Sequence, residues 1–419
     1  MYSFIMNITN FFLDLKLTNN KIIYLIYFLP ISLMIGSLAV NINVLILVLF
    51  FLYEIVKKKK FNFFIKKDLF FFIAIFVYLI LNSIFLAQNL DSFIRAIGFF
   101  RFFILVFALV YYFNIENCKY EKKILKAWSI VFFIITLDLI FEFFYGCNIL
   151  CFESTDNKRL ASFTGDEMKI GGYYFGFYLI TLSFIFRKNK KMLFYVFFLF
   201  FFTIAFLIGE RSNFVKIIFI SYFFFIILIE TKLLNKLIIL ILPIIIIASV
   251  INFNQNLKNK YYLEIIKPIL TNEYSHVPGN QSITSKYFQH YYSALEIFYD
   301  NKLFGVGIKN YRNESGKRYY NNETIYPSSN HPHQIHFELL AELGLVGYLL
   351  IFIFLITMLK EGVKIFKAQK NNESLAAILF ILATILPLLP SGSFFTTYGA
   401  TIFWINFSLL IKNNYSNRI

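Results

Sequence analysis

Charged side chains are scarce in this chain of 419 residues: they make up 15% of it, against 58% hydrophobic residues. The mean hydropathy is +0.65. A soluble globular protein needs a more polar surface, so the composition excludes that class. Many apolar runs are long enough to cross a hydrocarbon core about 30 Å thick. The expected fold class is therefore all-α, a polytopic helical membrane protein.

Cysteine is also rare, and phosphate-binding loops are lacking. The three cysteines, Cys118, Cys147 and Cys151, do not have the spacing of a metal site. Cys147 and Cys151 fall in one loop, either as two free thiols or as a disulfide that closes a very short ring. No glycine-rich loop ending in Lys-Ser/Thr and no repeat of fixed period occurs. Nothing here points to a metal or another cofactor.

Hydropathy and chain breakers predict about twelve membrane-spanning helices. The expected ranges are 22–38, 40–56, 69–86, 93–113, 125–145, 170–186, 192–209, 212–229, 233–251, 337–359, 373–390 and 394–411. One long polar segment interrupts them. The expected domains are a membrane bundle over 1–251, a loop subdomain over 252–336 and C-terminal membrane helices over 337–419. Within the loop subdomain, 281–300 is expected to form an amphipathic helix.

The basic residues behind the formal net charge of +16 gather in alternate short loops. These loops lie at 57–67, 119–126, 187–191, 232–236 and 360–370. The positive-inside rule makes them cytoplasmic, together with both termini, and puts the loop subdomain outside. The charge therefore sets orientation and does not call for nucleic acid. The apolar run after Lys21 lacks a small-residue cleavage site, so it is expected to stay as the first span.

Four arginines on the predicted outer side are not explained by topology: Arg95, Arg101, Arg159 and Arg211. Ionisable groups in or at membrane spans are costly, so they are functional hypotheses by default. A guanidinium also suits the oxygens of a pyrophosphate. Each arginine has an ordinary alternative as well. These are an interfacial anchor or a pair with Glu210 for Arg211, snorkelling for Arg95, a pair with Asp138 or Glu142 for Arg101, and a solvated charge for Arg159.

Three histidines stand where the loop subdomain meets the next predicted span. With Pro332 as an early helix residue behind a polar cap, His333 and His336 would lie at i and i+3 on one helix face. Imidazole is suited to acid–base chemistry near neutral pH, and His333 is favoured as the base. Two alternatives stay open. The set His331, His333 and His336 would serve as metal ligands, or the histidines would only shape the helix start.

A histidine followed by an amide and then an apolar helix with Glu-x-Gly-x-x-Gly is present as His333-Gln334 and the run 342–347. Further pieces follow the same order as in one known family: Arg159 with the segment 163–167, Gly209-Glu210-Arg211-Ser212, Gly305-Val306-Gly307 with Arg312, and Pro390-Ser391-Gly392-Ser393-Phe394-Phe395. The joint pattern resembles the O-antigen ligase and polymerase superfamily over roughly 155–410. Gln334 departs from the commoner asparagine but keeps an amide.

The resemblance implies a metal-independent, inverting glycosyltransferase of GT-C-like fold, without a cofactor, at the periplasmic face of the bacterial inner membrane. The donor would be a glycan on undecaprenyl pyrophosphate. The acceptor would be a lipid A-core sugar for an O-antigen ligase, or another lipid-linked glycan for a polymerase. By analogy His333 is the general base, and Arg211 and Arg312 bind the pyrophosphate. We expect further substrate contacts from Arg159, Gln334, His331, His336, Arg95 and Arg101.

A polysaccharide transporter or flippase is the alternative from another class. Transporters usually show internal repeats, broken helices and polar groups near the membrane midplane. In this chain the unexplained polarity falls on one face, which favours an enzyme. Ligase and polymerase share their donor chemistry, and no motif in the sequence separates them.

Overall fold

The computed structural model describes residues 19–152, 159–167, 169–187, 191–228, 283–416 and 418, with isolated positions at 241, 245, 248, 249 and 258. These residues form helices and contain no β-strand. The elements are α2 (Asn19–Ile35), α3 (Ser37–Lys57), η1 (Phe61–Phe63), α4 (Lys66–Asn82), η2 (Ser83–Ala87), α5 (Leu90–Tyr145), η3 (Ser162–Glu167), α6 (Ile170–Phe186), α7 (Lys191–Leu207), α8 (Arg211–Leu228), α12 (Ile283–Asp300), α13 (Tyr311–Tyr320), α14 (Ile335–Gln369), α15 (Asn372–Thr384), α16 (Thr397–Ile411) and η5 (Lys412–Tyr415).

By length and composition, six helical segments of the described chain can cross a membrane. They are Ser37–Lys57, Lys66–Ala87, Leu90–Ile115, Tyr120–Tyr145, Arg211–Leu228 and Ile335–Gln369. The shorter apolar helices are Ile22–Ile35, Ile170–Phe186, Met192–Leu207 and Asn372–Thr384. Each predicted span except 233–251 overlaps one of these helices or α16. The range 233–251 lies outside the continuously described residues, and the total of twelve stays a prediction.

The spans expected at 93–113 and 125–145 correspond to the membrane-length segments Leu90–Ile115 and Tyr120–Tyr145. Both belong to one long element, α5, and Cys118 at φ 63° lies between them. Two other predicted ends differ in the structure. α14 continues to Gln369, beyond the expected end at 359, and α15 ends at Thr384, before 390. The amphipathic helix expected over 281–300 is present as α12.

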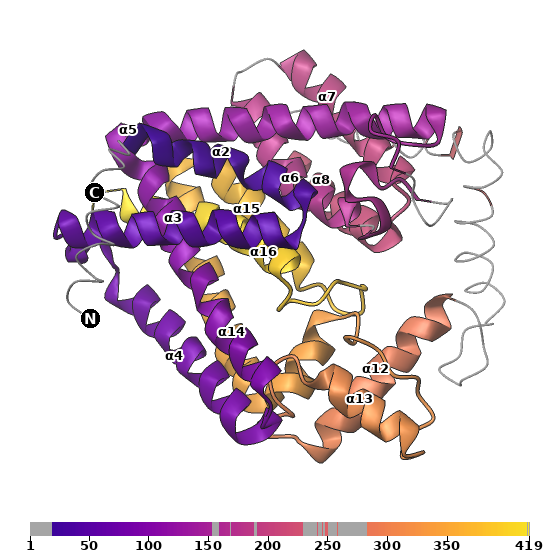
Figure 1. Cartoon of the computed structure of the whole chain (residues 1–419). Coiled ribbons are helices and arrows are strands. Elements are labelled where there is room, and N and C mark those ends of the chain that lie inside the picture. Colours follow the sequence, from indigo (N-terminus) through magenta and orange to yellow (C-terminus); the bar gives the residue numbers. More distant parts are fainter. Residues whose placement is uncertain are drawn as a thin grey trace.

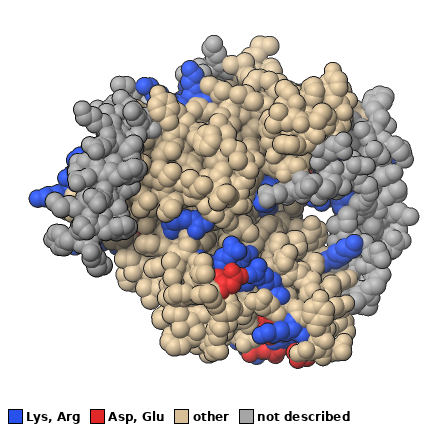
Figure 2. All heavy atoms as spheres, in the orientation of Figure 1, with Lys and Arg blue, Asp and Glu red and all other residues tan. Residues whose placement is uncertain are grey.

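The helices pack as a bundle with an extension at one end. Figure 1 shows α2, α3 and the long α5 lying side by side, and these three contact one another. α15 and α16 fill the middle of the bundle and pack against α6 and α5. α4 and α14 run obliquely toward α12 and α13, which pack against the start of α14. Charged side chains are sparse over the face in Figure 2, as the composition requires.

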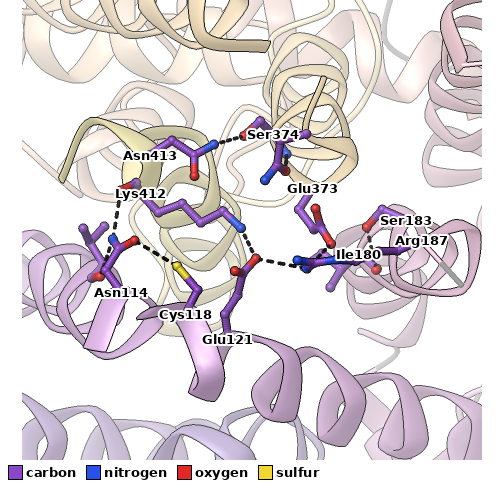
Figure 3. Close-up of polar contacts among 12 residues, drawn as sticks. Asn114, Cys118, Glu121, Ile180, Ser183, Arg187, Glu373, Ser374, Lys412 and Asn413 are labelled. Carbon is purple, nitrogen blue, oxygen red and sulfur yellow. Dashed lines mark hydrogen bonds and ion pairs between the residues drawn. The ribbon is translucent and has the colours of Figure 1, made fainter. Parts of the chain in front are cut away.

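A buried ionic network closes one end of the bundle (Figure 3). Glu121 of α5 contacts Lys412 of η5 and lies 3.7 Å from Arg187, which is 3.1 Å from Glu373 of α15. Glu121, Glu373 and Lys412 are almost fully buried. Removing one member would leave a buried charge unpaired, which is strongly destabilising. The network therefore joins segments next to three basic loops, 119–126, 187–191 and 360–370, which the sequence predicts to lie on the cytoplasmic side of the membrane.

The histidine segment lies at the other end of the molecule from the ionic network. Beside the network, the Tyr415 hydroxyl of η5 donates to Asp68 of α4 over 2.7 Å. Lys67, at the start of α4, pairs with Glu361, late in α14. Asn82, at the end of α4, contacts the start of α14, where its side chain donates to the carbonyl oxygen of Glu342 over 3.4 Å. α4 and α14 thus run antiparallel, and the histidine segment lies at the end far from the ionic network.

Candidate active site

α14 begins later than the sequence predicted, because Gln334 is its N-cap. The Gln334 side chain accepts hydrogen bonds from the amides of His336, at 2.7 Å, and Phe337, at 3.2 Å. His333 has a φ of 58°, outside the helical region. The expectation that Pro332 and His333 lie within the helix was therefore wrong. His333 and His336 do not share a helix face, and His333 stands in a turn before the helix.

Three imidazole rings meet in front of α14. The ring centroids of His331 and His333 are 4.0 Å apart, and those of His290 and His333 are 5.1 Å apart. His290 comes from α12, which also places the ring of Tyr287 at 5.6 Å from that of His333. We call His290, His331 and His333 the histidine cluster. His333 is its central member.

The histidine cluster favours neutral imidazoles. Burial, together with the neighbouring His331 and His290, lowers the pKa of His333 to about 3. Burial, Lys309 and His290 lower the pKa of His331 to about 4, although the backbone of Ser391 acts in the opposite direction. Burial also lowers the pKa of His290. A neutral imidazole has one nitrogen without a proton, as a general base requires.

Tyr287 links the histidine cluster to the predicted cationic residues. Burial raises the pKa of its phenol, while the positive charges of Arg159 and Arg211 lower it and the negative charge of Glu210 raises it. These three charges are therefore close enough to act on Tyr287. Tyr287 precedes His290 by about one helical turn on α12. Both arginines are partly buried.

Glu210 precedes α8, at the tip between α7 and α8 as predicted. Burial raises the pKa of its carboxyl, and Arg159 and Lys216 are the charges that oppose this effect. Its Oε1 accepts from the Asn213 side chain at 2.5 Å. The carboxylate thus balances the positive charge beside it.

The loop between α15 and α16 contacts the turn that carries His333. The Ser391 amide donates to the carbonyl oxygen of His333 over 2.7 Å. Ser393 contacts both Lys309 and Glu338 through its hydroxyl, and Glu338 also accepts from the Phe394 amide at 2.8 Å. Lys309 Nζ lies 3.7 Å from Glu338 Oε1. The Ser-Gly-Ser sequence is therefore a support for the turn that carries His333.

The two glycine motifs pack against each other. Gly344 interrupts α14 with φ 64°, and a Cβ there would overlap the backbone of 303–305. Across this kink, the amides of Val306 and Gly307 donate to the carbonyl oxygens of Ala341 and Glu342 at 3.0 and 2.9 Å. The Lys309 amide donates to Glu342 Oε2 at 2.7 Å. Glycine is needed at 344 because of both its left-handed conformation and this close approach.

The other predicted arginines lie apart from the cluster. Arg312 is exposed and forms an ion pair with Asp91 at the start of α5. Arg95 is also exposed. Arg101 donates to Asn41 Oδ1 at 2.9 Å and to Thr397 Oγ1 at 3.2 Å. The alternative pairing of Arg101 with Asp138 or Glu142 was wrong, since those carboxylates bind the amides of Ile149, Ala161 and Ser162.

His336 faces away from the other motif histidines. Its Nδ1 lies 3.1 Å from the Tyr348 hydroxyl and its Nε2 lies 2.8 Å from the carbonyl oxygen of Ile385. Both ring nitrogens are thus engaged, so the set His331, His333 and His336 does not converge on a metal. Among the described residues no group of three or more His, Cys, Asp or Glu side chains is arranged to hold a metal ion.

The sulfur atoms of Cys147 and Cys151 lie 2.7 Å apart, without a disulfide bond between them. Cys118 hydrogen-bonds to Asn114 near the ionic network, at the other end of the bundle (Figure 3). None of the three cysteines contributes to the histidine cluster.

Sequence reasoning missed His290, Tyr287 and Lys309. His290 and Tyr287 lie on the predicted amphipathic helix, at i and i+3, and this spacing was a usable signal. Lys309 belongs to the stretch that was noted for its glycines and Arg312, but its lysine was not singled out. The packing of α12 on α14 decides which side chains of α12 contact the histidine motif.

Part of the chain is similar to a known protein family. Residues 174–352 match a family model described as O-antigen ligase. The matched region runs from α6 into α14 and includes Arg211, α12, the histidine cluster and the kink at Gly344. No curated protein matches the chain. The family match assigns residues 174–352 of this chain to the O-antigen ligase-like superfamily.

Proposed function

We propose that this protein transfers a glycan from undecaprenyl pyrophosphate to a lipid A-core acceptor. The main support for this proposal comes from Tyr287. Its ring lies beside that of His333, and the charges of Arg159 and Arg211 lower the pKa of its phenol. A base and two guanidinium groups around one point suit a reaction in which a hydroxyl attacks a sugar and a pyrophosphate leaves. The proposal needs no metal and no cofactor.

Arg211 and Arg159 would bind the pyrophosphate. A guanidinium stays charged at any physiological pH and offers two parallel N–H donors to phosphate oxygens. As the bond to the sugar breaks, negative charge grows on the pyrophosphate, and prearranged cations stabilise it more than they stabilise the bound donor. Arg312 remains a proposed phosphate ligand. To bind the donor, it would have to break its exposed ion pair with Asp91.

His333 would be the general base. The acceptor hydroxyl gives its proton to the imidazole while its oxygen attacks the anomeric carbon from the side opposite the pyrophosphate, so that the configuration inverts. The turn before α14 presents His333 from outside the helix, and the Ser391 amide holds the carbonyl of the same residue. His331 would line the acceptor side of the pocket. The bound pyrophosphate would also raise the pKa of His333 toward the working range.

The reaction would take place on the periplasmic face of the bacterial inner membrane. The basic loops support this orientation, because they belong to the end of the bundle that holds the ionic network, opposite the histidine cluster. A lipid-linked donor would reach this face after it has been flipped across the membrane. Its sugar and pyrophosphate would then lie at the level of α12 and the histidine turn.

Transfer by the purified protein tests the proposal. The wild type would be reconstituted with a lipid-linked glycan donor and, in separate reactions, with a lipid A-core acceptor and with a second lipid-linked glycan. Transfer to the core acceptor is the expected result. Transfer to the lipid-linked glycan alone would make the protein a polymerase. Absence of both products, with intact folded protein, would overturn the assignment to glycan transfer.

A further inference from the structure

α12 brings into the histidine cluster an imidazole that the histidine motif does not contain. His290 lies with its ring centroid 5.1 Å from that of His333 and tilted by 34°. α12 packs on both α13 and α14, so the position of His290 is fixed by the fold of the loop subdomain. Tyr287, one turn earlier on the same helix, touches His333 from the side of the arginines.

Three polar atoms around His333 are buried and lack a hydrogen-bond partner within the part of the chain that the structure describes. They are His290 Nδ1, His331 Nε2 and Ser391 Oγ. Buried polar atoms in native proteins are nearly always paired. Three such atoms at one place, beside the proposed base, indicate a pocket that is completed by a polar group of the substrate or by water.

We propose that His290 is a positioning residue that orients His333 toward the acceptor hydroxyl and then receives the proton that His333 has taken. This inference rests on the proposed glycan transfer. It assigns a step of that reaction to a helix outside the His-Gln motif. The ring centroids are 5.1 Å apart, and among the described contacts no hydrogen bond joins the two rings, so one bridging water molecule would carry the proton between them.

The proton and electron balance is simple. The O–H bond of the acceptor breaks, and its proton goes to the free ring nitrogen of His333. The acceptor oxygen forms a bond to the anomeric carbon, and the bond from that carbon to the pyrophosphate oxygen breaks, so the electron pair leaves with the pyrophosphate. His333 then passes a proton to His290, which releases one to water or to the departing pyrophosphate. Nothing is oxidised or reduced.

Electrostatics explains why a second imidazole helps. His331 and His290 act on His333, Lys309 acts on His331, and Arg159, Arg211 and Glu210 act on the neighbouring Tyr287. Burial, His331 and His290 make a proton on His333 costly. Moving the proton to His290 returns His333 to the neutral form. Without such a partner, the proton would have to leave His333 directly to water.

Two variants of His290 in the full-length, reconstituted protein test this role. His290→Ala and His290→Gln should each lower kcat by about 10²-fold, the usual worth of a proton-transfer group, with the KM for the donor nearly unchanged. Exogenous imidazole should restore His290→Ala but not His290→Gln, where the site is filled. Lys286→Ala, on the exposed side of α12, is the control and should keep wild-type kcat.

The pH profile tests the electrostatic coupling between the two imidazoles, and the imidazole rescue tests the proton transfer. Without the His290 imidazole, less repulsion opposes a proton on His333, so the acidic limb of kcat in His290→Gln should move to higher pH. A wild-type kcat in His290→Ala would overturn the inference while leaving the proposed function intact. A kcat restored to the wild-type value in His290→Gln by exogenous imidazole would do the same. Donor binding by both variants checks that they are folded. Absence of transfer by the wild type would overturn the proposed function and this inference with it.

Discussion

The amide of Ser391 donates a 2.7 Å hydrogen bond to the carbonyl oxygen of His333. Ser391 lies in the loop between α15 and α16, whereas His333 precedes α14. His333 has a left-handed φ of 58°, a conformation that costs a non-glycine residue free energy and needs support from outside. This single bond therefore ties the proposed base to the C-terminal membrane helices.

Replacing Ser391 by proline tests that support. Proline has no N–H, so Ser391→Pro removes the bond to His333. A base misplaced by an ångström costs roughly 10²-fold in rate, and we expect a loss of that order in glycan transfer. Ser391→Ala keeps the amide and should lose far less. Transfer by Ser391→Pro at the level of Ser391→Ala would show that the bond does not hold His333 in place.

The kink in α14 predicts a difference between two glycine substitutions. Gly344 has φ 64° and its missing Cβ leaves room for the backbone of 303–305, so Gly344→Ala should destabilise the fold by at least about 1–3 kcal/mol. Gly316→Ala is the control, because nothing lies within 4 Å of a Cβ at this helical position. Thermal unfolding in detergent measures both. A Gly344→Ala variant as stable as Gly316→Ala would contradict the role of the kink as a close backbone contact.

The helical membrane fold was predictable from sequence because hydropathy depends on local composition. The predicted spans match helices wherever the chain is described, since a segment such as Ser37–Lys57 is apolar by itself. The boundary at the histidines was not predictable. The usual preference for proline early in a helix pointed to Pro332, but the side chain of Gln334 caps the helix two residues later and leaves His333 in a turn.

The histidine cluster itself was only half visible in the sequence. His331 and His333 lie in one motif, but their neighbour His290 comes from α12, and no local pattern states which face of that helix packs on α14. The same limit applies to Arg312, whose partner Asp91 lies on a distant helix. Residue type and spacing thus gave a hypothesis for the chemistry of the site, and tertiary packing decides which side chains lie together there.

Arg211→Lys tests phosphate binding. Lysine keeps the positive charge but loses the planar pair of N–H donors, so transfer should fall by about 10²-fold if Arg211 stabilises the leaving group. The matched control is Arg318→Lys on α13, whose arginine pairs with Asp300 and Glu314. Rates with a lipid-linked donor, and donor binding, are the measurements. Full activity in Arg211→Lys would leave this residue as an interfacial anchor.

Reporter fusions test the sidedness. Fusions after Lys58 and Lys367, in the basic loops, should report the cytoplasm, and fusions after Gln88 and Asn322 should report the periplasm. The structure places the first pair of positions beside helix ends that meet through Lys67 and Glu361. A cytoplasmic signal at Asn322 would contradict the proposed reaction, since a flipped lipid-linked glycan is present on the outer face of the membrane.

His333→Ala tests the general base directly. Hydroxyls are poor nucleophiles near neutral pH, and a placed base contributes about 10²–10⁴-fold, so a loss of that size is expected with donor binding retained. His336→Ala should cost less, because both nitrogens of His336 already bind Tyr348 and the carbonyl oxygen of Ile385. Equal losses in the two variants would argue for a shared role, such as metal ligation, in place of the base.

The pH profile and chelation complete the test of His333. Only its neutral form accepts a proton, so activity falls as the pH drops through its pKa, which burial and two neighbouring imidazoles lower to about 3 in the free protein. A bound pyrophosphate adds negative charge and raises that pKa. The acidic limb of kcat, which reports the bound state, should therefore lie at higher pH than that of kcat/KM for the donor. Transfer should also survive EDTA. Loss of transfer on chelation, restored by a divalent metal, would replace proton abstraction by metal-assisted chemistry at this cluster.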